Sequence, residues 1–291
     1  MMQTKQLTIF GEVLFDCFPG GENKLGGAPF NVAWHMQAMD DQPQFISRVG
    51  EDELGNAILR EMQDWGMDIQ TVQRDNQHPT GRVNVTLHDK EPSYDIARDS
   101  AWDFIDYPSI RNIPTEGLFY HGSLAARSET SRQTLQKLTD NPALDVFVDV
   151  NLRAPWWEKE ELYPWLERAR WVKLNQDELS ELGFRSADLH QDMTRMHTHF
   201  HLEQLIVTCG EKGAIVRDTE GEFHLVKPTA ATEVVDTVGA GDAFTAMYIH
   251  GLLHHWEIND ALHHAQQFAS QVVGQRGALS KEKEFYNIIN N

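Results

Sequence analysis

The chain has 291 residues, and its 44 acidic against 25 basic residues give a formal net charge of −19 at pH 7. That length is enough for one large α/β domain with a full hydrophobic core and a small appendage. The negative field repels DNA, RNA and anionic lipid, so we expect neither a nucleic acid nor a membrane as a partner, whereas local amides and arginines can still hold a small anion.

The amino-terminal segment MMQTKQLTIFGEV lacks the apolar core of a secretion signal, and no stretch approaches the roughly 18 apolar residues of a membrane span. The two cysteines, Cys17 and Cys209, form no CxxC pair. Free thiols are typical of a reducing compartment, so the sequence predicts a cytoplasmic protein.

Short β-branched or aromatic runs alternate with helical patterns along the whole chain. The predicted strands are 7–10, 45–49, 117–121, 146–150, 171–174 and 205–208. The predicted helices lie near 30–39, 52–65, 129–139, 157–169, 176–182, 188–201, 242–255 and 259–274. This alternation predicts a single α/β domain over residues 1–291, with a mostly parallel sheet covered on both faces. Active groups then belong at the carboxyl ends of the strands.

The first chemical motif is the glycine pair Gly26-Gly27, which leads into an apolar helix containing Asn31, with Asp16 ten residues before it. Backbone amides, a carboxylate and a carboxamide are natural partners for several sugar hydroxyls. Asn31 as a simple helix cap is the alternative interpretation.

The region from Arg82 to Ile105 breaks the alternation, because its apolar residues follow the pattern of two strands of a hairpin. We expect this hairpin and a strand at 14–18 to form a small β lid from two segments, about 12–30 and 82–107. Its aromatics are predicted to be exposed and to face a substrate or a second subunit: Tyr94, Trp102 and Phe104. An ordinary edge hairpin is the alternative.

Two polar groups follow predicted strands in the middle of the chain. Asp149, Asn151 and Arg153 point to one side if the strand alternation continues, and an arginine there suits a phosphate. Asn175 and Glu178 stand at the start of a helix. Their spacing is typical of a capping pair, and it would also serve water or Mg²⁺.

The segment VVDTVGAGDAFTA, 234–246, sets two glycines and an aspartate where an extended segment turns into an apolar helix. Gly239 and Gly241 let successive N–H groups approach one anion, and Asp242 follows in the first helical turn. Such a carboxylate can orient a hydroxyl and accept its proton as a phosphoryl group arrives. An unperturbed aspartate has a pKa of about 4, and the helix start favours its charged form further. A helix cap is the alternative role.

Other nucleotide and metal motifs are missing from the sequence. There is no GxxxxGK[ST] and no GxGxxG that follows a strand and opens a helix, which argues against P-loop enzymes and dinucleotide-binding dehydrogenases. The histidine groups near 197–201, 254–255 and 263–264 follow no zinc spacing, so we expect surface histidines there.

Taken in order, GGAPFNVA, DVNLR, NQDE, VTCGEKGA and DTVGAGDAF resemble the PfkB (ribokinase-like) family of carbohydrate kinases, from Gly11 to about Ala278. Within the family, GGAPFNVA with DVNLRAPWW is most similar to bacterial fructokinases. The resemblance implies a three-layer α/β/α fold with a small β-sheet lid, and transfer of the γ-phosphoryl group of ATP to a primary hydroxyl of a small sugar, above all fructose.

The resemblance also implies roles for individual residues. Asp242 is the base, and the amides of Gly239, Ala240 and Gly241 form the anion hole. Arg153 serves the phosphoryl region, Asn175 and Glu178 organise Mg²⁺ and phosphate, and Asp236 helps hold K⁺. The sugar residues are Asp16, Gly26, Gly27, Asn31, Tyr94 and Arg98, and the nucleotide residues are Thr208, Gly210 and Gly213.

Other functions of the same fold stay open at this point. A 2-keto-3-deoxygluconate kinase needs a basic residue for the substrate carboxylate, and Arg98 is the candidate. A ribokinase and a nucleoside kinase of the same family are further alternatives, and in a nucleoside kinase Tyr94 and Trp102 would stack on the base. A binding protein that has lost catalysis is a different class, and the joint presence of base, anion hole and Asn/Glu pair argues against it. A homodimer through the lid is expected from Ile96, Trp102 and Phe104.

Overall fold

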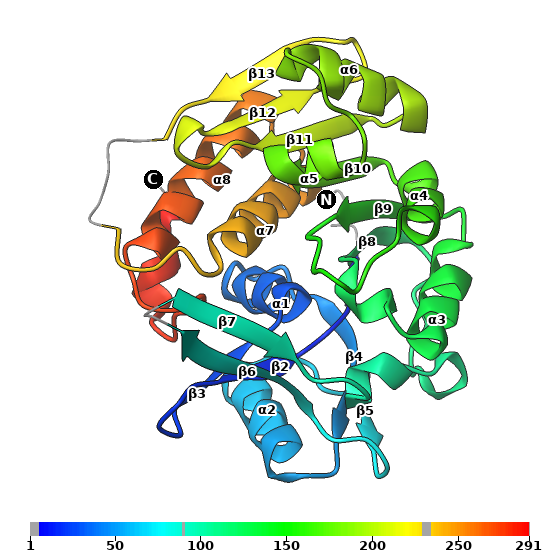
Figure 1. The fold of residues 1–291 in the computed structure, drawn as a ribbon, viewed down its shortest axis with the longest axis vertical. Coiled ribbons are helices and arrows are strands. Elements are labelled where there is room, and N and C mark those ends of the chain that lie inside the picture. The colour runs from blue at the N-terminus through cyan, green and yellow to red at the C-terminus, as the bar shows by residue number, and fades with distance from the viewer. Residues whose placement is uncertain (1–5, 89–90, 229–233, 291) are drawn as a thin grey trace.

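In the computed structural model we describe residues 6–88, 91–228 and 234–290, and the side chains of all of these except 85–94 and 288–290. Their main sheet has nine strands in the order β13-β12-β11-β10-β9-β8-β1-β4-β5 (Figure 1). Neighbours are parallel except at one edge, where β12 is antiparallel to both β11 and β13. The strands are β1 (Leu7–Phe10), β4 (Gln44–Gly50), β5 (Val72–Asp75), β8 (Gly117–His121), β9 (Leu144–Asp149), β10 (Trp171–Asn175), β11 (Gln204–Thr208), β12 (Ala214–Arg217) and β13 (Phe223–Val226).

Helices cover both faces of this sheet. One face carries α1 (Ala28–Ala38), α2 (Glu53–Asp64), α7 (Ala240–Leu253) and α8 (Ile258–Val273). The other carries α3 (Glu129–Thr139), α4 (Lys159–Arg168), α5 (Gln176–Glu181) and α6 (Leu189–Phe200). Successive strand residues enter opposite cores, as Phe119 and Tyr120 of β8 do. The predicted three-layer α/β fold with a mostly parallel sheet is therefore confirmed.

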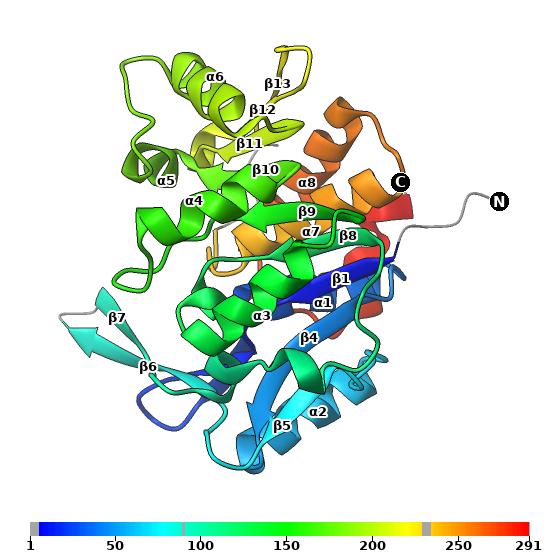
Figure 2. The same cartoon turned by 90° about the vertical axis from the view of Figure 1, so that its right-hand side faces the viewer.

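A second sheet has four strands among the described residues, in the order β3-β2-β6-β7. They are β2 (Leu14–Cys17), β3 (Asn23–Gly26), β6 (Gly81–His88) and β7 (Glu91–Ile96). Figure 2 shows the β6–β7 hairpin projecting from the body of the molecule. The small sheet is also tied to the carboxyl-terminal part of the chain, where Arg276 pairs with Glu22 at 3.2 Å.

The expected exposure of the lid aromatics is wrong for Trp102, which is fully buried. Residues Ala101–Phe104 form a 3₁₀ turn with a capping box between Ser100 and Asp103, and this turn directs the indole into the core beside Phe10. Phe104 is half-buried and stacks on the His78 ring, with centroids 3.6 Å apart. Ile96 packs against the same core as Trp102. The Tyr94 side chain lies outside the described side chains.

The sequence patterns did not reveal four short strands, β3, β5, β12 and β13. Each has four residues, and three of them lie at a sheet edge. Short edge strands carry polar residues on their open side, so their alternation is weak. Across the described parts of the chain, no helix combines the length and the apolar character that crossing a membrane requires.

Candidate active site

The two glycine motifs meet at the amino-terminal ends of α1 and α7. Asn31 in the first turn of α1 donates a hydrogen bond from Nδ2 to Asp242 Oδ2 in the first turn of α7, at 2.7 Å. The two residues are 211 positions apart in the chain. Asn31 is buried and caps no helix, because α1 already begins at Ala28 with Gly27 as its N-cap. The cap interpretation of Asn31 is therefore wrong, and its carboxamide orients the Asp242 carboxylate.

The pKa of Asp242 is higher than its place at a helix start suggests. Burial raises its pKa to about 6, the Asn31 hydrogen bond and the nearby charges of Lys173 and Arg153 lower it, and the Asp149 carboxylate raises it. A carboxylate with this pKa is a better proton acceptor at neutral pH than an unperturbed aspartate and is still largely ionised there. The local dipole is thus outweighed by desolvation.

The backbone before Asp242 forms a glycine turn that an anion can approach closely. Gly239 has φ 81°, and a Cβ there would lie 2.3 Å from the Cβ of Ala278, so only glycine fits. Gly239 is the N-cap of α7, and Ala240 and Gly241 are its first two residues. The N–H groups at this end have no acceptor within the helix, which suits an anion there, although the Ala240 N–H makes a long hydrogen bond of 3.4 Å to the Thr237 carbonyl. A Cβ on Gly241 would stand 3.4 Å from Lys173 Nζ, so an ammonium group borders the same end of the helix.

A buried ion pair beneath this helix end was missed by the sequence analysis. Lys173 Nζ in β10 lies 3.0 and 3.1 Å from the two Asp149 carboxylate oxygens in β9. The Thr245 hydroxyl of α7 donates to Asp149 Oδ2 at 2.8 Å. Although burial opposes it, attraction to Asp149 and Glu178 raises the pKa of Lys173, so the ammonium stays charged. A lone lysine inside the apolar strand WVKLN was the sequence signal.

Glu12, two residues after the end of β1, was also missed by the sequence analysis. Its side chain is buried, and burial raises its pKa to about 7, opposed by the Glu12 backbone and by Arg153 and Arg127. Three buried atoms around Asp242 have no hydrogen-bond partner among the described residues: Glu12 Oε2, Tyr120 Oη and Asn31 Oδ1. Burial raises the pKa of Tyr120, and the charges of Asp149, Asp242 and Glu12 raise it further. The signal in the sequence was an acid at the carboxyl end of a fully buried strand.

Asp16 on β2 and the glycine pair Gly26-Gly27 at the end of β3 lie close together in the small sheet. A Cβ on Gly26 would be 3.4 Å from Asp16 Oδ2, and one on Gly27 would be 2.7 Å from the Glu12 carbonyl. Gly27 has φ 110°, so both its conformation and its contact require glycine. Burial raises the pKa of Asp16 to about 6, opposed by Lys24 on the neighbouring strand.

The expected strand alternation through Arg153 is wrong. β9 ends at Asp149, and Asn151 adopts a left-handed backbone with φ 38°. The turn leaves Asp149 buried and Arg153 exposed, yet the charge of Arg153 still acts on both Glu12 and Asp242. Arg98 is exposed and stacks on the Trp156 ring at 4.8 Å, and Arg127 stacks on the same ring at 4.4 Å.

Asn175 and Glu178 form the capping box of α5. Asn175 Oδ1 accepts from the Glu178 N–H at 2.9 Å, and Glu178 Oε2 accepts from the Asn175 N–H at 2.8 Å. The other oxygen, Glu178 Oε1, accepts from the Leu152 N–H at 2.8 Å, next to Arg153. Burial raises the pKa of Glu178, whereas these N–H groups and Lys173 lower it. Each carboxylate oxygen keeps one lone pair for a metal-bound water.

The remaining predicted residues lie farther along the sheet edge and in the loops before α7. Thr208 of β11 is the parallel neighbour of Asn175. Gly210 and Gly213 flank the turn into β12, and Gly213 is held at φ 92° against the Val226 carbonyl. Asp236 accepts from the N–H groups of Val238 at 3.1 Å and Gly277 at 3.0 Å. It therefore joins the loop before α7 to the loop after α8.

Comparison with known proteins places the chain in a family. The model of the pfkB family carbohydrate kinases matches residues 17–284, which is most of the chain. The chain belongs to the pfkB family of carbohydrate kinases. It is 30% identical over 258 residues to a fructokinase of Escherichia coli, covering 84% of this chain and 83% of that protein. It is 29% identical over 266 residues to a fructokinase of Klebsiella pneumoniae, covering 86% and 85%.

Solved structures agree on the fold of this pfkB-family kinase. A Vibrio cholerae O395 fructokinase bound to fructose, ADP and a calcium ion superposes with a TM-score of 0.85 at 24% identity, covering 95% of both chains. An aminoimidazole riboside kinase from Salmonella enterica, bound to aminoimidazole riboside and an ATP analogue, gives 0.84 at 21% identity, covering 98% of both. The match to the pfkB family model makes the protein a sugar phosphotransferase.

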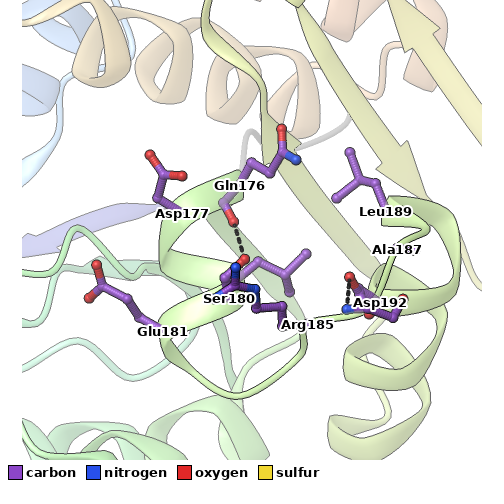
Figure 3. A pocket seen from close by; sticks show the side chains of 10 residues that line it. Gln176, Asp177, Ser180, Glu181, Arg185, Ala187, Leu189 and Asp192 are labelled. Carbon is purple, nitrogen blue, oxygen red and sulfur yellow. Dashed lines mark hydrogen bonds between the residues drawn. The ribbon is translucent and has the colours of Figure 1, made fainter.

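A hollow of about 580 Å³ on this kinase has a lining that does not include the candidate active-site residues. It is lined by α5, the start of α6 and the loop between them, including Asp177, Ser180, Arg185 and Asp192 (Figure 3). The lining is polar, and its residues do not include any of the predicted site residues. Volume alone therefore does not mark the reactive centre.

Proposed function

We propose that this kinase transfers the γ-phosphoryl group of ATP to the primary hydroxyl of fructose, with Asp242 as the base. The observation that carries this proposal is the half-buried Asp242 carboxylate, hydrogen-bonded by Asn31 at the amino-terminal end of α7. The choice of fructose is supported by the bacterial relatives named fructokinases, which are 29–30% identical over most of the chain.

In the proposed reaction, the sugar hydroxyl oxygen attacks the γ-phosphorus while the bond from that phosphorus to the bridging oxygen of ADP breaks. The hydroxyl proton passes to Asp242, whose raised pKa suits this transfer. The N–H groups of Gly239, Ala240 and Gly241 and the Lys173 ammonium stabilise the charge on the transferring group, and Arg153 supplies a further positive charge. Asp16, Gly26, Gly27 and Asn31 bind the remaining hydroxyls.

The proposed nucleotide and ion sites follow the same edge of the sheet. Thr208, Gly210 and Gly213 line the nucleotide, and their loop adjoins Asn175 through the β10–β11 pairing. Both Glu178 oxygens already accept one N–H each, so the residue fits Mg²⁺ through bound water. When bound, Mg²⁺ neutralises charge on the phosphates. Asp236 fits a role in K⁺ binding because its hydrogen bonds join the loop before α7 to the loop after α8, and the backbone carbonyls of such loops can bind a cation.

Turnover across a panel of acceptors tests this proposal. ADP release is coupled to an indicator reaction with Mg-ATP and K⁺ for fructose, ribose, glucose, mannose, tagatose, 2-keto-3-deoxygluconate and several nucleosides. Turnover on fructose that Asp242→Asn abolishes is the expected result. Preference for 2-keto-3-deoxygluconate would assign the exposed Arg98 to the substrate carboxylate and replace fructose. No turnover on any acceptor by the folded protein would refute the proposal.

A further inference from the structure

Three metal-binding side chains meet at the carboxyl-terminal ends of α1 and α7, away from Asp242. Asp41, three residues beyond the end of α1, places Oδ2 2.7 Å from His250 Nδ1 and Oδ1 2.9 Å from His254 Nε2. The ligand atoms of these residues all lie within 4.8 Å of one another. Sequence spacing alone did not reveal this group, because Asp41 is 209 positions away from His250.

His250 lies in the last turn of α7 and His254 is the C-cap of that helix, so the two histidines, four residues apart, stand on the same side. Their ring centroids are 4.2 Å apart, and the His250 ring is fixed edge-on against Trp256. The side chains of Asp41 and His250 are only 5% and 7% exposed, whereas that of His254 is 37% exposed. The group is therefore rigid on its inner side and open to solvent on its outer side.

We propose that Asp41, His250 and His254 bind one divalent transition-metal ion of the zinc type. Two imidazole nitrogens and a carboxylate oxygen are ligands that Zn²⁺ prefers, and water from the His254 side completes a tetrahedral shell. Binding requires each facing nitrogen to be unprotonated. A neutral imidazole meets this requirement by carrying its proton on the other ring nitrogen, so its hydrogen bond to Asp41 is replaced by the bond to the metal. The ligand atoms then separate by a few tenths of an ångström from their hydrogen-bonding distances.

A metal ion bound at this site joins two helices of the fold. α1 and α7 lie side by side in the fold (Figure 1) and run in the same direction. Their amino-terminal ends are joined by the Asn31–Asp242 hydrogen bond, and their carboxyl-terminal ends by Asp41 with the two histidines. A bound ion therefore clamps the same helix pair that holds the proposed base, without touching the substrate site.

Zinc titration of the metal-free protein tests this site. The full chain is treated with chelator, and Zn²⁺ binding is measured by calorimetry together with the thermal unfolding midpoint, for the wild type and for His254→Gln. His255→Gln is the matched control, because His255 is the next residue, is exposed and lies outside the group. This control matters because the chain contains 14 histidines.

We expect one Zn²⁺ per chain and a higher unfolding midpoint for the wild type and His255→Gln. Loss of even an outer-shell partner of a metal ligand weakens binding about 10- to 100-fold, so His254→Gln should lose at least about tenfold in affinity. Co²⁺ as a substitute should give visible absorption of a tetrahedral site that the same variant abolishes. Equal Zn²⁺ binding in both variants, or no binding by the wild type, would overturn the proposal.

Discussion

Replacing Asn31 by leucine tests whether its hydrogen bond sets the pKa of the proposed base. The variant keeps a side chain of similar size and removes the Nδ2 donor that lies 2.7 Å from Asp242. A hydrogen bond to a charged group contributes about 1.5–3 kcal/mol, and one pKa unit corresponds to about 1.4 kcal/mol. The pKa of Asp242 should therefore rise from about 6 by about one to two units.

The consequence is a loss of turnover that depends on pH. If turnover follows the ionised fraction of Asp242, Asn31→Leu should lose about 5- to 50-fold in kcat at pH 6 and less than about 1.2-fold at pH 9. Coupled ADP release at saturating sugar and ATP, measured from pH 5 to 9, gives both profiles. A sugar-positioning role alone would lower kcat equally at every pH.

The matched control is Asn56→Leu, the same change at a carboxamide that accepts from Arg74 on the surface of α2. Its profile should follow that of the wild type. An Asn31→Leu profile with the acid limb of the wild type would refute the assignment of this hydrogen bond. A wild-type profile with no acid limb near pH 6 would refute Asp242 as the base.

Three further predictions concern the base, the glycine turn and the cation. Asp242→Asn should lower kcat by orders of magnitude and leave ATP binding by calorimetry largely unchanged; near-normal turnover would argue against the role of the carboxylate. Gly239→Ala should lower the free energy of unfolding by at least about 1 kcal/mol, because it combines a positive φ of 81° with a contact of 2.3 Å to Ala278. Gly241→Ala, whose Cβ would meet only Lys173 Nζ at 3.4 Å, should unfold in urea like the wild type, and equal midpoints for all three proteins would contradict the argument. Turnover should be faster in K⁺ than in tetramethylammonium, and equal rates would remove the cation site.

Most of the layer order could be predicted from the sequence, because apolar periodicity is a local property. The central strands 7–10 and 117–121 are buried on both faces, so their uninterrupted apolar runs stand out. The edge strands β5 and β13 and the short β12 carry too little apolar pattern to be recognised. Trp102 was misassigned because the sequence analysis placed it among the exposed aromatics of the β lid, whereas the 3₁₀ turn at Ala101–Phe104 buries it.

For the candidate site, the sequence by itself determined which residues carry chemistry near a glycine turn. Gly239, Gly241 and Asp242 are neighbours in the chain, and the conformational demands of such a turn are local. Only the tertiary structure decided which partners those residues have. Asn31 and Asp242 meet across 211 positions, and Asp149, Lys173 and Thr245 meet from two strands and a helix. Burial at that meeting point, which no local pattern encodes, raises the pKa of Asp242.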